Sequence, residues 1–348
     1  MRRFLIAAAL ACLAITARAE QKNVQILTGL SDAELQRNMQ LIRSALGVNC
    51  DFCHMPNEQG KIDFASDAKK EKETARDMIQ MTQKLNREQF GDRAMISCNT
   101  CHRGAVNPVA LVSLPQAVPQ STPPPARPAL PSLADVVKHY TAALGDVARL
   151  QSARILHGTR EGWDGKPLPM EIEETPEKMH TAVTTPAGRI EQWSNEIAGW
   201  STDAKGVRPL TADQLEMFHQ LTAAYEPMLP AAIPQDARVI AKQKIGDRDT
   251  ILVAARLDEK TRERLYFDET TGLLMRRMVI RDGPIGPIPQ QTDYDDYRDV
   301  SGTKFPFTVR LSLVDPWTSS TRRYTDVQLG AKVDDSVFTP PAETRPSS

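Results

Sequence analysis

This chain of 348 residues has little net charge, few cysteines and, beyond its first residues, no long apolar run. Its 43 Lys and Arg side chains nearly balance 44 Asp and Glu side chains, so we expect neither nucleic acid nor a polybasic membrane contact. No later segment is long and apolar enough to cross a bilayer, and we therefore expect no transmembrane segment. The long C-terminal part also lacks a Ser/His/Asp set or a carboxylate pair with a recognisable catalytic spacing.

The few cysteines are concentrated in one motif. Of the five, all except Cys12 lie in two copies of Cys-x-x-Cys-His, at residues 50–54 and 98–102. Two thiols three residues apart can each add to one vinyl group of the same haem, and the adjoining histidine then binds the iron. The motifs therefore predict two covalently attached c-type haems. The thioether residues are Cys50, Cys53, Cys98 and Cys101, and the proximal iron ligands are His54 and His102.

Two other uses of paired cysteines remain open. A zinc ion takes four Cys or His ligands in one tetrahedron, which the two pairs could supply together. A redox dithiol of thioredoxin type lies between a strand and a helix of a βαβ unit, and neither motif has that setting. Neither alternative explains the histidine that follows each pair, so we favour haem.

The N-terminus predicts export. Residues 1–19 combine Arg2 and Arg3, an apolar run from Phe4 to Ile15, and Ala17-Arg18-Ala19 before Glu20, which is the pattern of a cleaved signal peptide. A lipid anchor at Cys12 would need a better lipobox and would cut the apolar run short. We therefore expect a periplasmic protein, in an oxidising compartment where thioether bonds keep the cysteines from forming disulfides.

Proline marks the boundary between two parts of different composition. Residues 109–131 have no helical or strand period and include Pro123-Pro124-Pro125, which is typical of a semi-rigid extended linker. All the cysteines after Cys12 precede it. We expect a multidomain protein, in which a small all-α dihaem cytochrome c domain at residues 20–108 precedes an α+β domain at residues 132–342. The linker should cross no core, and each side has its own secondary-structure period, so cleavage within Thr122 to Pro131 should release two folded parts.

The first part repeats one pattern: a helix, a turn and a haem motif. Ser31-Asp32-Ala33-Glu34 is a capping box, which predicts a helix from about Asp32 to Leu46. A second helix should begin near Ser66 or Asp67 and end near Phe90. The first carries the apolar stripe Leu35, Met39, Ile42 and Leu46, and the second carries Ala75, Met78, Ile79, Met81 and Leu85.

Each iron also needs a sixth ligand. Between Glu20 and Pro131 the only histidines are His54 and His102, so a thioether is the remaining good low-spin ligand nearby. Methionine on an apolar stripe is more often core filler. Because no spare histidine is available here, we expect Met39 to bind the first haem. Met81 and Met78 lie on one face of the second helix, and either could bind the second.

These residues resemble the haem-binding repeats of the cytochrome subunit of photosynthetic reaction centres. The likeness covers about residues 30 to 108 and is carried by Met39-x-x-Ile42-x-x-x-Leu46-Gly47-Val48-Asn49-Cys50, by Met78-x-x-Met81-x-x-x-Leu85-Asn86, and by Cys101-His102-Arg103-Gly104. In that family a methionine of the preceding helix binds the far face of most haems, five residues before an Asn, which favours Met81 over Met78. The family subunit carries four haems, whereas this chain has two motifs.

The second part predicts a curled antiparallel sheet over one or two helices. A short helix should begin at Ser132 and end at Gly145, and another should span about Ala212 to Tyr225. Between and after them come short alternating runs separated by turn signals: residues 153–160, 170–174, 180–184, 189–194, 251–257, 264–267, 273–281, 305–314 and 322–329. The pattern resembles the half-barrel of lipoprotein-carrier proteins, which would imply an apolar cavity, whereas an ordinary packed core is the simpler interpretation.

Three functions are consistent with these features. An exported dihaem cytochrome would carry single electrons to or from a redox protein of the cell envelope, could associate with a membrane complex, and would not be an enzyme. A dihaem peroxidase would need one open sixth position. An envelope protein could bind an apolar ligand in its β-rich part and use the haems as a redox input. We favour the electron carrier.

Overall fold

The computed structural model describes residues 22–108, 111, 114–115, 129–195, 197–203, 206–212, 214–215, 218–219 and 228–341. The expected signal peptide with Cys12, most of the linker and much of the helix expected at 212–225 lie outside the described residues. None of the helices in the described part combines the length and the apolar character that a membrane crossing requires.

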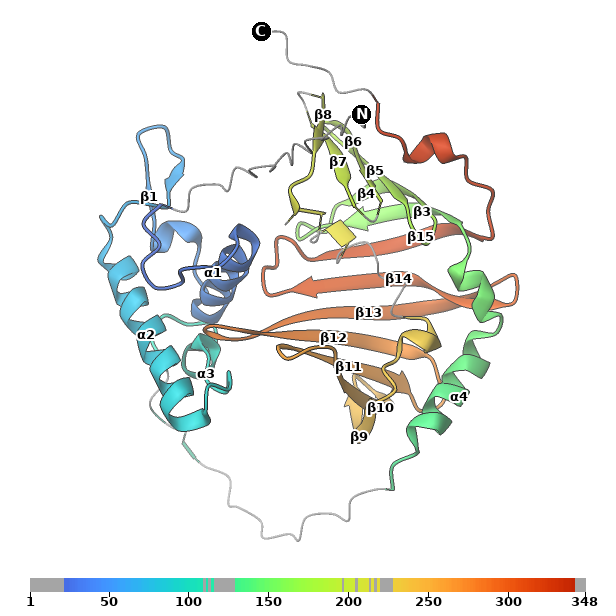
Figure 1. Cartoon of the computed structure of the whole chain (residues 1–348), viewed down its shortest axis with the longest axis horizontal. Coiled ribbons are helices and arrows are strands. Elements are labelled where there is room, and N and C mark those ends of the chain that lie inside the picture. The colour runs from blue at the N-terminus through green and yellow to red at the C-terminus, as the bar shows by residue number, and fades with distance from the viewer. Residues whose placement is uncertain are drawn as a thin grey trace, which may run out of the picture.

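The N-terminal part is built from three helices (Figure 1). Helix α1 spans Asp32–Leu46, α2 spans Lys70–Phe90, and the short α3 coincides with the second motif, Cys98–His102. The predicted capping box is confirmed, because the Ser31 side chain accepts from the Glu34 N–H and the Glu34 carboxylate accepts from the Ser31 N–H. Gly47 ends α1 in the left-handed conformation at φ 68°, which glycine adopts without strain.

Two details of this part differ from the prediction. Helix α2 begins at Lys70 rather than near Asp67, because the Asp67 carboxylate binds the side chains of Lys72 and Arg76 instead of capping the helix. The part is also not wholly helical, since β1, Met55–Pro56, and β2, Ile62–Asp63, pair as a short antiparallel ladder. Asn57 closes the turn between them by accepting from the Gln59 and Lys61 N–H groups.

The C-terminal part is one antiparallel sheet of 13 strands among the described residues. Consecutive strands pair with each other, except that β8 and β9 lie at opposite edges of the sheet. Strand β15 pairs with β3, which joins the two halves of the sheet at its centre. The strands are β3 Arg154–Glu161, β4 Pro167–Glu174, β5 Met179–Thr185, β6 Gly188–Ser194, β7 Gly199–Asp203, β8 Gly206–Pro209, β9 Arg238–Ile245, β10 Arg248–Arg256, β11 Thr261–Asp268, β12 Leu274–Gly283, β13 Gly286–Val300, β14 Thr303–Leu313 and β15 Ser320–Leu329.

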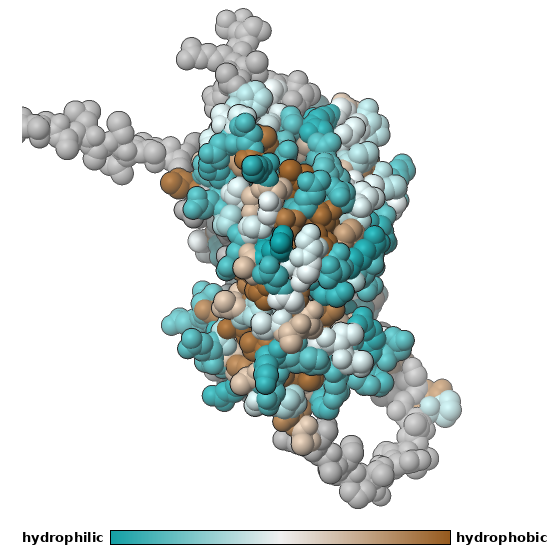
Figure 2. Space-filling view, turned by 90° about the vertical axis from the view of Figure 1, so that its right-hand side faces the viewer, coloured by the Kyte–Doolittle hydropathy of each residue, from teal (hydrophilic) through white to brown (hydrophobic). Residues whose placement is uncertain are grey.

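Helix α4, Leu133–Leu144, packs across one end of this sheet, as the sequence predicts (Figure 1). Its fully buried Tyr140 and Leu144 lie in one cluster with Phe267 and Phe305 of the strands, and the Tyr140 hydroxyl donates to the Met228 carbonyl at 2.5 Å. The core is therefore an ordinary packed interior in which the buried hydroxyl has its partner. The outer surface on this side shows hydrophobic residues only in small groups between hydrophilic ones (Figure 2).

The two parts touch each other, which the sequence does not predict. The β12–β13 hairpin reaches the helices of the N-terminal part (Figure 1), and Ile285 at its tip is fully buried in a cluster with Leu27, Leu41 and Ile79. The small apolar cluster of the N-terminal part thus includes a side chain from the C-terminal part (called the sheet part below), so the two parts share an interface.

Candidate haem-binding site

Each Cys-x-x-Cys-His motif forms one tight helical turn. In the first, a 3₁₀ turn at Cys50–Phe52, the N–H groups of Cys53 and His54 both donate to the Cys50 carbonyl. In the second, the Ser97 side chain accepts from the Thr100 N–H and the Thr100 side chain accepts from the Ser97 N–H, so that the two residues cap α3. A turn of this kind places two residues three apart on one side. Cys50 and Cys101 are exposed, and Cys53 and Cys98 are half-buried.

All four cysteines are free thiols in this structure. Burial is the main cause that raises the pKa of Cys53 and of Cys98, so both thiols are protonated at neutral pH. Among the described residues no group of three or more His, Cys, Asp or Glu side chains is placed to hold a metal ion. The two pairs therefore do not come together as the four-ligand zinc site that the sequence left open.

The two motifs are packed against each other through α1. The Gly104 N–H, just after the second motif, donates to the Ala45 carbonyl of α1 at 2.7 Å. A Cβ atom on Gly47, just before the first motif, would lie 2.2 Å from the Gly104 carbonyl oxygen. Gly47 is therefore required both by its backbone conformation and by the close approach of the second motif.

The second motif presents its histidine in the tautomer that an axial ligand needs. His102 Nδ1 lies 3.1 Å from the Ala105 carbonyl oxygen. Because a carbonyl can only accept, Nδ1 carries the proton and Nε2 keeps its lone pair. A hydrogen bond from the other ring nitrogen to a carbonyl is the usual way in which a protein orients a metal-binding histidine.

The first histidine is also suited to bind a metal, but its surroundings are different. His54 Nδ1 is buried, and no hydrogen-bond partner reaches it from the described residues. The ring lies edge-on to Phe64, with centroids 5.1 Å apart. Burial, and then the charges of Lys72 and Arg76, lower the pKa of His54, so the imidazole is neutral at pH 7, the form that coordinates iron.

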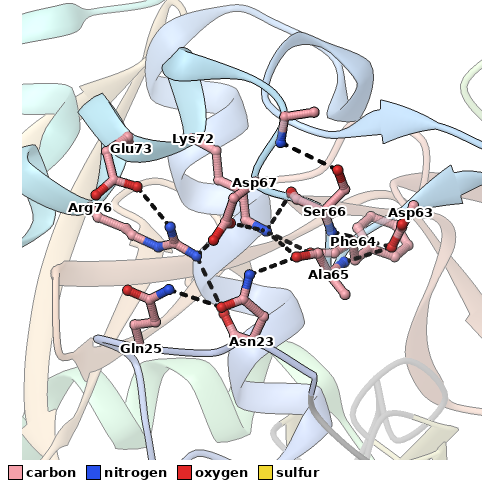
Figure 3. A network of polar contacts seen from close by, with 11 residues as sticks. Asn23, Gln25, Asp63, Phe64, Ala65, Ser66, Asp67, Lys72, Glu73 and Arg76 are labelled. Carbon is pink, nitrogen blue, oxygen red and sulfur yellow. Dashed lines mark hydrogen bonds and ion pairs between the residues drawn. The ribbon is translucent and has the colours of Figure 1, made fainter.

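A polar network holds the loop that carries Phe64 (Figure 3). The Lys72 ammonium donates to the carbonyls of Phe64 and Ser66 at 2.9 and 2.8 Å. The Asp67 carboxylate accepts a hydrogen bond from Arg76 Nη2 at 2.8 Å. This bond is the largest cause that lowers the pKa of Asp67. Because Lys72 and Arg76 are buried, this network, rather than apolar contact, fixes the start of α2 against the first motif.

Asn86 has the corresponding role at the second motif. Its buried amide accepts from the N–H groups of Met95 and Ile96 at 3.0 and 2.8 Å and donates to the Ile96 carbonyl at 2.8 Å. These three bonds connect the end of α2 to the residues just before Ser97 and Cys98. The sequence shows Asn86 only as part of the family resemblance, and its structural role was missed.

Helix α2 turns a largely polar face inward and part of its apolar stripe outward. Its buried residues are Lys72, Arg76, Ile79, Thr82 and Asn86, whereas Met78, Met81 and Leu85 are 39, 46 and 39% exposed. Helix α1 differs, because its buried residues are mostly apolar and Leu35 and Ile42 pack on the small cluster, while Met39 is 38% exposed. The period 72, 76, 79, 82, 86, in which Ile79 alone is apolar, is a sequence signal that could have identified the buried face of α2. Exposed apolar stripes of this kind commonly mark a binding surface.

The predicted methionine ligands Met39 and Met81 are both exposed on these helices. Met39 is on α1, which leads into the first motif, and Met81 is on α2, which leads toward the second. Met78 is exposed to a similar extent as Met81, so exposure does not choose between them. The residues present therefore fit haem groups: two pairs of thiols, two histidine imidazoles and exposed apolar side chains that include thioethers.

Comparisons with known proteins agree with this geometry. Residues 8–130 match the family described as the photosynthetic reaction centre cytochrome C subunit. Cytochrome c-554 of Chloroflexus aurantiacus is 36% identical over 91 residues, 24% of this chain and 21% of that protein. The photosynthetic reaction center cytochrome c subunit of Rubrivivax gelatinosus is 31% identical over 134 residues, 31% of this chain and 36% of that protein. The chain thus spans about a fifth to a third of these relatives.

Solved structures resemble the C-terminal part more distantly. A LolA superfamily protein from Nitrosomonas europaea aligns over 60% of this chain and 97% of its own, with 12% identity and a TM-score of 0.42. A DUF1329 family protein from Desulfovibrio piger aligns over 60% of this chain and 97% of its own, with 9% identity and a TM-score of 0.39. The matches to the N-terminal part confirm the resemblance predicted from the sequence and support a c-type cytochrome, similar there to the cytochrome c subunit of photosynthetic reaction centres.

Proposed function

We propose that this protein is an exported carrier of single electrons with two covalently bound c-type haems. Residues 20–108 would form the haem domain, 109–131 the linker and 132–342 the sheet domain. The residues that would hold the haems are Cys50 and Cys53 with His54, and Cys98 and Cys101 with His102. Met39 and Met81 would close the sixth positions, with Met78 as the alternative to Met81.

The single observation that carries this proposal is the inverted orientation of α2, which buries polar side chains and exposes Met78, Met81 and Leu85. An apolar side chain exposed to water costs about 25 cal/mol per Å², and here several such side chains lie together on the helices that flank the motifs. The faces of these helices that are buried instead contain Asn38, Lys72 and Asn86. A porphyrin has large apolar faces, so these stripes suit it, and the buried polar groups fix the surrounding loops.

The chain's own residues would determine how the haems behave. A haem supplies an iron that accepts and returns one electron. His102 Nδ1 donates to the Ala105 carbonyl, which leaves Nε2 for the iron, and the neutral His54 ring is oriented by its edge-on contact with Phe64. A thioether at the sixth position raises the potential relative to a second imidazole and excludes small ligands. These properties belong to a carrier rather than to an enzyme.

The partner would be a redox protein of the cell envelope. The matched relatives include a reaction centre subunit, so a membrane complex is one candidate, and the periplasm is the compartment that the sequence predicts. In the described part of the sheet domain the concave side is filled by buried aromatic side chains such as Tyr140, Phe267 and Phe305. That packing supports a structural sheet domain more than a ligand carrier.

The sixth ligands distinguish a carrier from a peroxidase. If both irons have thioether ligands, the oxidised protein will show the weak near-infrared sulfur-to-iron band for two low-spin haems, and the reduced protein will not bind carbon monoxide at neutral pH. Met81→Ala should open one haem to carbon monoxide, and Met78→Ala is its matched control on the same helix face. If Met78→Ala opens the haem instead, Met78 is the ligand and the carrier function stands.

Met39→His gives an independent check at the first haem. The variant should keep a low-spin haem with a lower potential, because imidazole stabilises the ferric state better than thioether does. A high-spin haem in the unmodified protein, together with turnover of peroxide, would contradict the carrier and support the enzyme.

A further inference from the structure

The sheet part contacts the chain just before the first haem motif through one cluster of three residues. Arg43 of α1 donates from Nη1 to the Asp315 carboxylate at 2.9 Å, and its guanidinium carbon lies 3.3 Å from the centroid of the Trp317 ring. Arg43 also donates to the Val48 carbonyl at 3.2 Å and to the Asn49 side-chain oxygen at 3.3 Å. We call Arg43, Asp315 and Trp317 the Arg43 cluster; it connects the β14–β15 loop to the residue before Cys50.

The Arg43 cluster is fixed from the sheet side. Asp315 is buried. Its carboxylate accepts from the Trp317 N–H at 3.1 Å and from the side-chain amide of Gln40 of α1 at 3.3 Å. A buried charge of this kind is strongly coupled to its partner, because little water screens the pair. The positive charge of Arg43 is therefore balanced by a carboxylate from the other part of the chain.

The sheet part contacts the second motif through the tip of the β12–β13 hairpin, residues 283–286. Ile285 is fully buried, and Cys98 packs against the same apolar cluster. A Cβ atom on Gly286 would lie 2.3 Å from the Ser97 Cβ, so the backbone of the hairpin tip comes as close to the second motif as sterics allow. The hairpin tip therefore shields the Cys98 side of that motif from water.

We propose that the sheet part sets the redox potentials of the two haems separately, through the Arg43 cluster at the first motif and the hairpin tip at the second. The proposal rests on the proposed function, since it needs two bound haems. A protein adjusts a haem potential by nearby charge and by burial. The sheet part supplies one of these influences at each motif: a compensating charge at the first and an apolar cover at the second.

The two influences predict shifts of opposite sign. Asp315→Asn removes the carboxylate but keeps its shape, which leaves Arg43 as an uncompensated positive charge near the first motif. Positive charge disfavours the ferric form, so the potential of the first haem should rise. Ile285→Ala lets water approach Cys98, and water stabilises the ferric form, so the potential of the second haem should fall.

The experiment is a redox titration of the full-length protein that follows both haems, with the first haem assigned by the lowered potential of Met39→His. Asp315→Asn should raise one potential and leave the other unchanged, and the double variant Arg43→Gln with Asp315→Asn should return it toward the original value. Asp335→Asn is the matched control, because Asp335 pairs with Lys178 at 2.9 Å on the sheet part, away from both motifs. That variant should move neither potential.

Ile285→Ala should lower the other potential, and Ile285→Val should lower it less. Ile172→Ala is the matched control, since Ile172 is equally apolar and buried in the core of the sheet, where truncation costs stability without touching a motif. Unchanged potentials in Asp315→Asn and in Ile285→Ala, or equal shifts of both haems, would overturn the proposal. Fewer than two bound haems in the unmodified protein would instead contradict the proposed function.

Discussion

The two parts of this molecule reach a stable structure in different ways. The sheet part buries a large apolar cluster between its strands and α4, with fully buried side chains such as Phe305 and Leu274. The N-terminal part buries only Leu27, Leu41 and Ile79 in its cluster, together with Ile285 from the sheet. It depends otherwise on polar side chains that bind loop backbone, as Lys72 and Asn86 do. From this difference we expect that the sheet folds on its own interior, whereas the N-terminal part needs the sheet and the proposed haems.

The largest expected effect comes from preventing haem attachment. Replacing the four motif cysteines with Ala should leave the sheet folded and make the N-terminal part sensitive to protease, because the few apolar side chains that it buries do not form a sufficient core. Limited proteolysis with mass mapping measures this, and the unmodified haem-loaded protein is the control. Protection of α1 and α2 in the haem-free variant would show that the two parts do not differ in this way.

The second prediction concerns the sheet alone. Arg154 and Glu174 form a buried pair, in which Nη2 and Nε donate to the two carboxylate oxygens at 2.7 and 3.0 Å. Glu174→Ala leaves Arg154 buried without this partner and should lower the free energy of unfolding of the sheet by about 3–5 kcal/mol. Asp335→Ala, which breaks an exposed pair, should have little effect. Thermal unfolding followed by circular dichroism checks both, and a change in the haem spectrum of Glu174→Ala at room temperature would contradict the conclusion that this pair stabilises the sheet alone.

The third prediction concerns the contact between the motifs. Gly47→Ala should destabilise the N-terminal part by more than the roughly 1–2 kcal/mol that a left-handed conformation costs a residue with a Cβ, because its Cβ would also meet the Gly104 carbonyl. Gly60→Ala is the matched control, since Gly60 has φ 73° and nothing lies within 4 Å of its Cβ position. Urea unfolding monitored by the haem absorbance should separate them, and equal costs would mean that the motifs are not tightly packed.

The smallest expected effect depends on pH. The backbone hydrogen bond from Ser31 is the main cause that lowers the pKa of Glu34 below the 4.5 of an ordinary glutamate. A lowered pKa means that the folded state favours the carboxylate, so this contribution is present above pH 4.5 and is lost as the pH falls below it. Glu34→Gln should therefore lose less stability than the unmodified protein between pH 6 and about pH 3. Identical pH dependence in acid unfolding experiments would rule out this role of the cap.

Local sequence patterns predicted much of this fold, because the residues that form these patterns also determine where each helix or strand begins and ends. The cap at Ser31, the stop at Gly47 and the helix from Ser132 to Gly145 were confirmed. The alternating runs correspond to strands β3 to β6, β10 to β12, β14 and β15. Strand β13 was missed because Pro287, Pro289 and its run of Asp and Gln resemble a loop, although its neighbours on both sides supply its hydrogen bonds.

The contacts between the two parts could not be predicted, because they depend on residues far apart in the sequence. Ile285 follows Gly283 and Pro284 and precedes Gly286, which is the pattern of an exposed turn. Its burial follows only from the position of the hairpin tip. Arg43 and Asp315 likewise have ordinary surface positions in their own elements and meet only in the folded chain. The haem-ligand assignments at Met39 and Met81 remain predictions.

The most direct test of this account is the mass of the mature protein and of its proteolytic fragments. We expect the mass of the polypeptide plus two haems that resist extraction by acid acetone, with one haem on the fragment that contains Cys50 to His54 and one on the fragment that contains Cys98 to His102. A protein that carries no covalent haem, or only one, or that binds zinc through its cysteines instead, would contradict the account.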